Sequence, residues 1–398
     1  MQIGEVASFQ NGYAFKSKDF VQDGKYKIIK IKELKDGKVR FFNDSASVNV
    51  DDERIIEKYI VEKGDVLFAL TGDPVNKNNP LSWVGRVSVY EDDQLALLNQ
   101  RVCKLVPKEG LNAKYIYYYF RVFDNFYALA SIAKGSASQA NISTKDIEAM
   151  EIALPSLNIQ NKIVSVLDSI EEKINQNNKI NKNLEQQAKA IFSNEFLTLE
   201  TLPDGWKQAS LIDIADYLNG LAMQKHRPTA DETGIPVLKI KELRQGCCDN
   251  NSELCSPSIK SEYIIHDGDV IFSWSGSLLV DFWCGGICGL NQHLFKVTSN
   301  KYNKWFYYAW TKHHLDRFIA VAADKATTMG HIKRDELSKA EVLISNEADY
   351  KRIETLLQPI YDLIIANRIE NKKLAETRDT LLPKLMTGEI DISEVDYE

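Results

Sequence analysis

The feature that most constrains the fold is an ordered series of matches between the two halves of the chain. The segment KIKEL occupies residues 30–34 and recurs at residues 239–243. Further matches follow in the same order: EVASFQNGYAF with DIADYLNGLAM, YIVEKGDVLFALTG with YIIHDGDVIFSWSG, LNQRVCKL with LNQHLFKV, and KYIYYYF with KWFYYAW. The offset drifts from 209 to 190 residues, as loops of unequal length allow. The chain is therefore an internal duplication, and each half must contain a complete fold.

Each repeat begins with a globular part of about 150 residues. Segments such as YKIIKIKEL and GDVLFAL have the alternation of β-strands, and Gly and Asn residues mark turns between them. A helical stretch rich in Tyr and Phe is expected near residues 115–129. These patterns predict a mixed α/β (α+β) domain with a twisted, mainly β core.

Each repeat ends in a long helix whose apolar residues are spaced 4-3-4-3. The first seam is Ile163, Leu167, Ile170, Ile174, Asn177, Asn181, Leu184, Ala188 and Ile191. The second seam is Ile353, Leu357, Ile360, Ile364, Asn367, Asn371, Leu374, Arg378 and Leu381. A period of 3.5 residues is typical of a coiled coil, and buried Asn fixes its register. The paired Asn predict that the two helices lie against each other, antiparallel; two separate surface helices are the alternative.

The boundaries follow from these patterns. Globular domains are expected at 1–153 and 200–345, spacer helices at 154–199 and 346–388, and an acidic tail at 389–398. Pro383 and Gly388 are expected to end the second helix. The first repeat lacks a counterpart of LPDGW at 202–206, so we expect its N-terminal edge to pack differently, or the start codon to lie upstream. Antiparallel helices would give the chain a pseudo-two-fold axis, as in dimeric proteins that bind two DNA half-sites.

Composition limits the kind of partner. No secretion signal and no apolar run of membrane-spanning length are present, which favours the cytoplasm. Residues 1–150 contain 21 basic and 20 acidic residues, and residues 200–345 contain 16 and 18. Binding of nucleic acid would therefore depend on local patches and not on bulk charge.

We find no sequence signature of catalysis or of metal binding. Phosphate-binding loops, hydrolase and metalloprotease motifs and dinucleotide-binding loops are all missing from the sequence. The six cysteines lack the paired C-x2-C spacing of zinc modules, so reduced, partly buried thiols are expected and no metal. The chain is predicted to be a non-enzymatic binding protein without a cofactor of its own.

The order of domain, helix, domain and helix resembles the specificity subunit of type I restriction–modification systems. So do GDVIFSWSGS, LNQHLFKV, MGHIKRDEL and LPSLNIQNKIV. The resemblance implies that each domain reads one half of a bipartite site in double-stranded DNA. It also implies that the helices act as a ruler and a dock for two adenine-N6 methyltransferase subunits. ATP-dependent restriction subunits would join them, so S-adenosylmethionine and ATP belong to the partners.

The duplication suggests how to sort residues that contact DNA. Where the copies differ, side chains are expected to contact bases, and the candidates are Lys16, Lys18, Asn76, Lys77, Asn78, Asn79, Trp83, Arg86, Gln224, Lys225, His226 and Arg227. Shared features are expected to contact the DNA backbone, and those candidates are Thr71, Arg101, Lys134, Ser136, Ser138, Gln139, Ser275, His293, Lys325, Thr327, Thr328, His331, Lys333 and Arg334. Internal hydrogen bonding or an ordinary charged surface loop is the alternative for each. For the whole chain, the alternative is a repeat-built scaffold that binds proteins and no DNA.

Overall fold

The computed structural model describes residues 1–74, 84–136, 139–324 and 334–394. It divides into two compact units, Met1–Ile170 with Thr377–Glu398 and Glu171–Glu376, called here the first and second unit. The long helices α6 (Leu157–Phe192) and α12 (Glu347–Thr387) contribute to both. In the described part of the chain, no helix is long and apolar enough to cross a membrane.

The described residues of the first unit form three sheets. One has the order β1-β12-β8-β10-β5-β4, the next β2-β6-β3-β11-β7, and the smallest β13-β14-β9. The strands are β1 (Ala7–Asn11), β2 (Phe20–Val21), β3 (Tyr26–Ile29), β4 (Leu34–Lys35), β5 (Lys38–Val39), β6 (Ser47–Val48), β7 (Ile60–Val61), β8 (Val66–Ala69), β9 (Thr71–Gly72), β10 (Val87–Val89), β11 (Ala96–Leu98), β12 (Val102–Pro107), β13 (Lys134–Ser136) and β14 (Gln139–Asn141). Its other helices are α1 (Ile3–Val6), α2 (Glu53–Tyr59), α3 (Ala113–Tyr119), α4 (Phe123–Ser131) and α5 (Thr144–Glu148).

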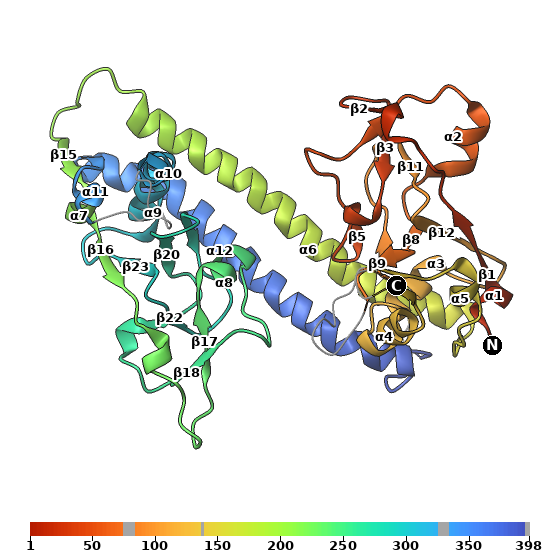
Figure 1. Ribbon diagram of the computed structural model, residues 1–398. Coiled ribbons are helices and arrows are strands. Elements are labelled where there is room, and N and C mark those ends of the chain that lie inside the picture. The colour runs from red at the N-terminus through yellow and green to blue at the C-terminus, as the bar shows by residue number, and fades with distance from the viewer. Residues whose placement is uncertain (75–83, 137–138, 325–333, 395–398) are drawn as a thin grey trace. The chain divides into compact units, whose positions relative to one another are not determined.

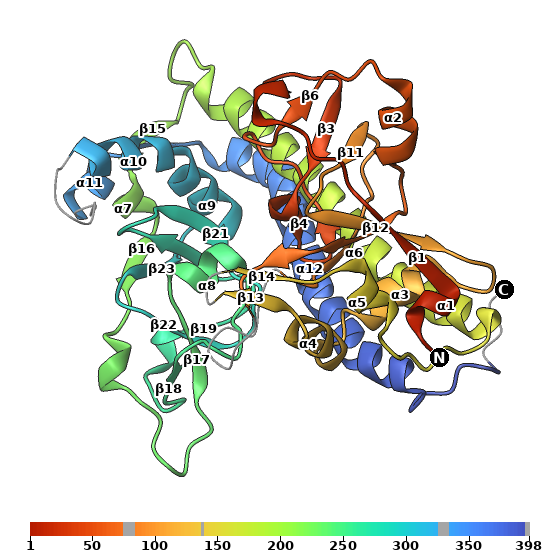
Figure 2. The same cartoon turned by 45° about the vertical axis from the view of Figure 1, so that its right-hand side comes forward.

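The second unit repeats the two larger sheets in a shorter form, with the orders β16-β23-β20-β21 and β18-β17-β22-β19 (Figure 2). The strands are β15 (Lys207–Ser210), β16 (Asp216–Asn219), β17 (Ile235–Leu238), β18 (Leu254–Cys255), β19 (Ile264–Ile265), β20 (Val270–Ser273), β21 (Leu279–Phe282), β22 (Cys288–Leu290), β23 (Leu294–Thr298) and β24 (Glu341–Ile344). Its other helices are α7 (Leu211–Ile214), α8 (Ile240–Gln245), α9 (Lys304–His313), α10 (Leu315–Asp324) and α11 (Arg334–Ser338).

The two units share one topology. The order β1-β12-β8-β10 corresponds to β16-β23-β20-β21, and β6-β3-β11-β7 corresponds to β18-β17-β22-β19. Both second sheets contain one parallel pair at the same place, β3 with β11 and β17 with β22. Such agreement in strand order and direction confirms the duplicated α/β fold.

At the N-terminal edge the units differ. Strand β15 pairs with β24 over four residues, from Lys207 opposite Ile344 to Ser210 opposite Glu341. In the first unit the corresponding contact is a single bridge between Gln2 and Glu151. The segment that the first repeat lacks is therefore the one that leads into β15.

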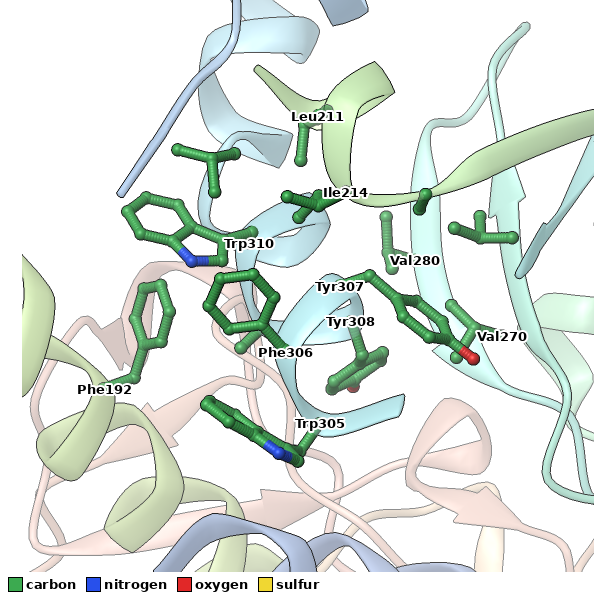
Figure 3. Packing of buried hydrophobic residues seen from close by; sticks show 14 of the residues in the cluster. Phe192, Leu211, Ile214, Val270, Val280, Trp305, Phe306, Tyr307, Tyr308 and Trp310 are labelled. Atoms are coloured by element: carbon green, nitrogen blue, oxygen red, sulfur yellow. The ribbon is translucent and has the colours of Figure 1, made fainter. Parts of the chain in front are cut away.

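An aromatic helix forms the centre of each core. In the second unit, Trp305, Phe306 and Trp310 of α9 pack beside Phe192 of α6 (Figure 3). In the first unit, α3 presents Tyr115 and Ile116 to Ile163 and Leu167 of α6. Both cores also include residues of α12, so each globular part packs directly on the long helices.

The helix pairing predicted from the seams is confirmed inside the second unit. Asn177 Nδ2 donates to Asn371 Oδ1 at 2.9 Å, and Asn367 Nδ2 donates to Asn181 Oδ1 at 2.9 Å. From the first bond to the second, the residue number rises on α6 and falls on α12, so the two helices run antiparallel here (Figure 1). All nine positions of each predicted seam are buried or half-buried.

Two local predictions were wrong, and a third, the helical stretch near residues 115–129, is confirmed as helical but in two pieces. Helix α12 continues through Pro383 to Thr387, and only Gly388, at φ +74°, ends it. The stretch near 115–129 forms two helices, because the chain turns between Tyr119 and Phe123, where the Asn125 amide donates to the carbonyl of Tyr119 at 2.9 Å. The strand expected through YKIIKIKEL ends at Ile29, and residues Ile31–Glu33 form a 3₁₀ turn.

Candidate nucleic-acid interface

In both units a glycine lies against the backbone of the repeated Asn-Gln pair. We call this arrangement, Gly12 with Asn99 in the first unit and Gly220 with Asn291 in the second, the Gly–Asn corner. A Cβ on Gly12 would lie 2.2 Å from the carbonyl oxygen of Asn99, and one on Gly220 would lie 2.3 Å from that of Asn291. The residue after each glycine is bridged in parallel to the same Asn. No larger residue fits such an approach of two backbones, so the glycine fixes where the Asn-Gln pair lies.

The repeated segment KIKEL forms the second part of the corner. Its glutamate is buried: Glu33 is 0% exposed and Glu242 is 4% exposed. Glu33 accepts from the backbone N–H of Lys30 at 3.1 Å and from Ser45 Oγ at 2.7 Å. Glu242 has the same kind of partners, Lys239 N–H at 3.3 Å and Ser252 Oγ at 3.2 Å.

This carboxylate closes a helical turn, and the two lysines that precede it in the sequence are exposed. Lys239 and Lys241 lie with their side chains 37% and 61% exposed. Burial raises the pKa of Glu33, although the hydrogen bonds from Ser45 and Lys30 oppose that shift. In KIKEL the glutamate thus stabilises the turn, and the two lysines contribute positive charge.

In the second unit the corner opens on a cavity of about 460 Å³. Its lining residues come from four separate segments of the chain: Gln224, Arg227, Lys239, Ile240, Lys241, Glu253, Asn291, Gln292 and His293. Three of the predicted residues, Gln224, Arg227 and His293, therefore meet at one site. Amide, guanidinium and ammonium donors of this kind bind base edges and phosphates.

Two predicted pairs lie side by side at equivalent positions. In the first unit, Arg101 Nη1 donates to Thr71 Oγ1 at 3.5 Å, and Thr71 Oγ1 donates to Asn141 Oδ1 at 2.7 Å. In the second unit, Ser275 Oγ lies 3.1 Å from His293 Nδ1. The residue after Asn-Gln thus contacts the hydroxyl after β8 or β20, whether it is Arg or His.

The other predicted residues of the first unit lie on three further segments, one of which pairs with the strand that contains Thr71. Lys16 and Lys18 are exposed at a 3₁₀ turn, Ser17–Asp19. Arg86 is half-buried, and burial lowers the pKa of its guanidinium while Asp36 and Asp73 raise it. In the hairpin β13–β14, which pairs with β9, are Lys134, Ser136 and Gln139.

The remaining predicted residues of the second unit have local roles. Lys225 is exposed at the 3₁₀ turn Met223–Lys225, and the carbonyl of His226 accepts from Ser256 N–H at 2.8 Å. Arg334 donates to the carbonyl of Tyr217 at 2.7 Å, which ties α11 to β16. Eleven candidates lie outside the described residues: Asn76, Lys77, Asn78, Asn79, Trp83, Ser138, Lys325, Thr327, Thr328, His331 and Lys333.

Sequence reasoning missed Lys239, Lys241 and Glu253, which all line the cavity. The recurrence of KIKEL was the available signal for the lysines, but the strand interpretation hid it. Of the first-unit counterparts, Lys30 has different neighbours, whereas Lys32 pairs with an aspartate just as Lys241 pairs with Asp249 at 3.2 Å. Lys30 Nζ lies 3.8 Å from the ring centre of Phe20, and Lys32 pairs with Asp44 at 2.8 Å.

Acidic residues have structural partners at equivalent positions in both units. Asp65 pairs with Lys104 at 3.1 Å and Asp269 with Lys296 at 2.9 Å. Each carboxylate also accepts a backbone N–H at the turn that opens its strand. Among the described residues, no group of three His, Cys, Asp or Glu side chains could hold a metal ion.

Comparison with known proteins agrees with this architecture. The family model for the type I restriction modification DNA specificity domain matches residues 1–186 and 203–376. The chain belongs to this family. Its two matched segments each include one globular part and part of a long helix.

Two curated relatives and one solved structure are similar to this chain over most of its length. The specificity subunit of the type I restriction enzyme MjaIX from Methanocaldococcus jannaschii is 26% identical over 322 residues, covering 75% of this chain and 73% of the relative. The putative MjaX specificity subunit of that organism is 22% identical, covering 92% and 88%. The crystal structure of a type I S subunit from M. genitalium shares the fold, with a TM-score of 0.61 at 16% identity over 97% of this chain and 95% of that one.

Proposed function

We propose that this specificity-family chain recognises a bipartite, asymmetric site in double-stranded DNA, with one half-site for each unit. The observation that supports it is the Gly–Asn corner, which has one backbone geometry in both units and different polar side chains. Arg101 stands at the first corner and His293 at the second. A common frame with different donors is what two different half-sites require.

Local charge favours this proposal over bulk attraction. Residues 200–345 are slightly acidic overall, yet Arg227, Lys239 and Lys241 meet around one cavity with the amides of Gln224 and Gln292. Arg forms bidentate contacts with guanine, and Gln does so with adenine, each worth about 1–3 kcal/mol of discrimination. The cavity is therefore suited to contacts with bases as well as phosphates.

The paired helices are the proposed dock for two adenine-N6 methyltransferase subunits and for ATP-dependent restriction subunits. Inside the second unit, Ile180 on α6 is 45% exposed, and Leu356 and Leu363 on α12 are 43% and 45% exposed, so a subunit docked on the helices would cover apolar side chains. S-adenosylmethionine and ATP would be bound by those partners in the cytoplasm. This chain would contribute recognition and assembly, without a reaction of its own.

Mapping methylated adenines in the source genome tests the proposal. We expect one bipartite motif with a gap of unspecified bases. Exchanging residues 200–345 for those of a relative should change one half of the motif and leave the other half intact. Change in both halves would refute the assignment of one unit to each half-site. A methylation pattern that ignores the exchange would favour the scaffold without DNA recognition.

A further inference from the structure

Glu253 stands at a position where the two repeats share their backbone and differ in charge. Its carbonyl accepts from Val237 N–H at 2.7 Å, and in the first unit the carbonyl of Ala46 accepts from Ile28 N–H at 2.9 Å. Each of these residues directly follows the serine that binds the buried glutamate of KIKEL. Glu253 and Ala46 are therefore structural counterparts, and only the second unit has a carboxylate there.

The Glu253 carboxylate binds two of the three cations of the cavity. Oε1 lies 2.6 Å from Lys239 Nζ, and Oε2 lies 3.2 Å from an Arg227 Nη. The hydrogen bond and charge of Lys239, followed by the charge of Arg227, lower the pKa of Glu253. The carboxylate is thus ionised at neutral pH and lies between two donors of the kind that bind phosphates.

The first unit shows the arrangement without this carboxylate. Lys30, the counterpart of Lys239, lies over the ring of Phe20 at 3.8 Å. In the first unit the counterpart of Glu253 is Ala46, whose side chain is uncharged. The two units therefore differ in charge at this position: the second has a carboxylate there and the first has none.

We propose that Glu253 is a specificity determinant of the second unit. Its carboxylate holds Arg227 and Lys239 in ion pairs, and a DNA half-site must break these pairs to bind. This inference depends on the proposed function of DNA recognition. Phosphates are present in every sequence, so unpaired cations would attract any duplex. A carboxylate that competes for them weakens all complexes, and only a half-site with well-placed base contacts compensates for the loss.

The test compares the wild-type chain with Glu253→Gln, each assembled with the methyltransferase subunits of its system. Fluorescence anisotropy would measure affinity for the duplex containing the mapped motif and for one with the second half-site scrambled. We expect Glu253→Gln to bind the scrambled duplex roughly threefold to tenfold more tightly, with a smaller change on the motif. The slope of log K against log salt on the scrambled duplex should steepen by about 0.9 for each phosphate gained.

Two variants serve as controls. Glu262→Gln removes the same charge from an exposed turn of the second unit, outside the cavity lining, and should leave discrimination unchanged. Ala46→Glu places the carboxylate in the first unit and should weaken binding to a duplex scrambled in the first half-site. If the wild type discriminates and Glu253→Gln behaves like Glu262→Gln, the inference about Glu253 is wrong. A wild type that binds both duplexes equally would overturn the proposed DNA recognition itself.

Discussion

The paired asparagines of the long helices permit a quantitative test of the helix pairing. Asn181 and Asn367 are 6% and 8% exposed, and the amide of Asn367 donates to Asn181 Oδ1 at 2.9 Å. The amide of Asn181 donates in turn to the carbonyl of Ile364 at 3.3 Å. Replacing one asparagine by Leu removes the bond and leaves the partner amide buried without its acceptor or donor.

The magnitude follows from a double-mutant cycle of Asn181→Leu and Asn367→Leu. Stranding a buried polar group costs about 1–3 kcal/mol, whereas removing both partners together is close to neutral. The apolar gain of each Leu enters the single and double variants alike and cancels from the coupling. Because each single variant strands one group, we expect the double variant to be at least about 2 kcal/mol more stable than the sum of the two single changes.

Thermal unfolding followed by tryptophan fluorescence provides the assay. Five of the six tryptophans, Trp206, Trp274, Trp283, Trp305 and Trp310, belong to the second unit. For a unit of this size, 1 kcal/mol shifts Tm by about 2–4 °C. The non-additivity should therefore appear as about 4–8 °C.

The cycle has a clear negative outcome. Additivity within about 0.5 kcal/mol would show that the two amides do not interact, and the antiparallel register deduced from them would be refuted. A parallel cycle with Asn181→Leu and Glu262→Gln, whose second site is a turn outside the helix pair, should be additive.

Two further predictions concern the shared frame. Lys104→Met and Lys296→Met each remove the cation beside a half-buried aspartate, and each should reduce the free energy of unfolding by about 2 kcal/mol in urea titrations; a cost in one unit only would contradict their equivalence. Because the pKa of Glu33 is raised by burial, its contribution to stability is complete below its unfolded-state value near 4.5 and declines as pH rises through the folded-state value. Tm measured against pH should thus fall less steeply for Glu33→Gln than for the wild type across that window, and parallel profiles would refute the burial effect.

The duplicated frame was predictable because it depends on many positions at once. Each block of matching sequence leaves a matching contact, such as Asp65 with Lys104 and Asp269 with Lys296. The helix pairing was predictable for the same reason, since a seam sustained over nine positions has few physical solutions. The sequence pattern did not show where the helical stretch near residues 115–129 divides, which is where the Asn125 amide donates to the carbonyl of Tyr119.

The candidate site was predictable only in part. Gln224, Arg227 and His293 were found because they differ from the first repeat or flank a shared motif. The lysines of KIKEL were missed because alternation of apolar and charged residues favours a strand. A strand would leave Glu33 and Glu242 on a polar face, whereas their burial beside Ser45 and Ser252 bends the chain into a turn. A serine 10 or 12 residues away cannot be matched to its glutamate from periodicity alone.

The pattern of shared and divergent contacts bears on how such a chain can change its specificity. Arg101 and His293 follow the same Asn-Gln pair, and Ala46 and Glu253 accept the same backbone hydrogen bond. At these positions the backbone is held by glycine, by the buried glutamate and by hydrogen bonds between backbone groups. Substitution there changes donors and charges without moving the chain, whereas substitution at Gly220 would displace the Asn291 backbone and the cavity with it. We therefore expect point substitutions to change specificity at Ala46, Arg101 and their counterparts Glu253 and His293. We expect them to fail at residues that fix the backbone, such as Gly220.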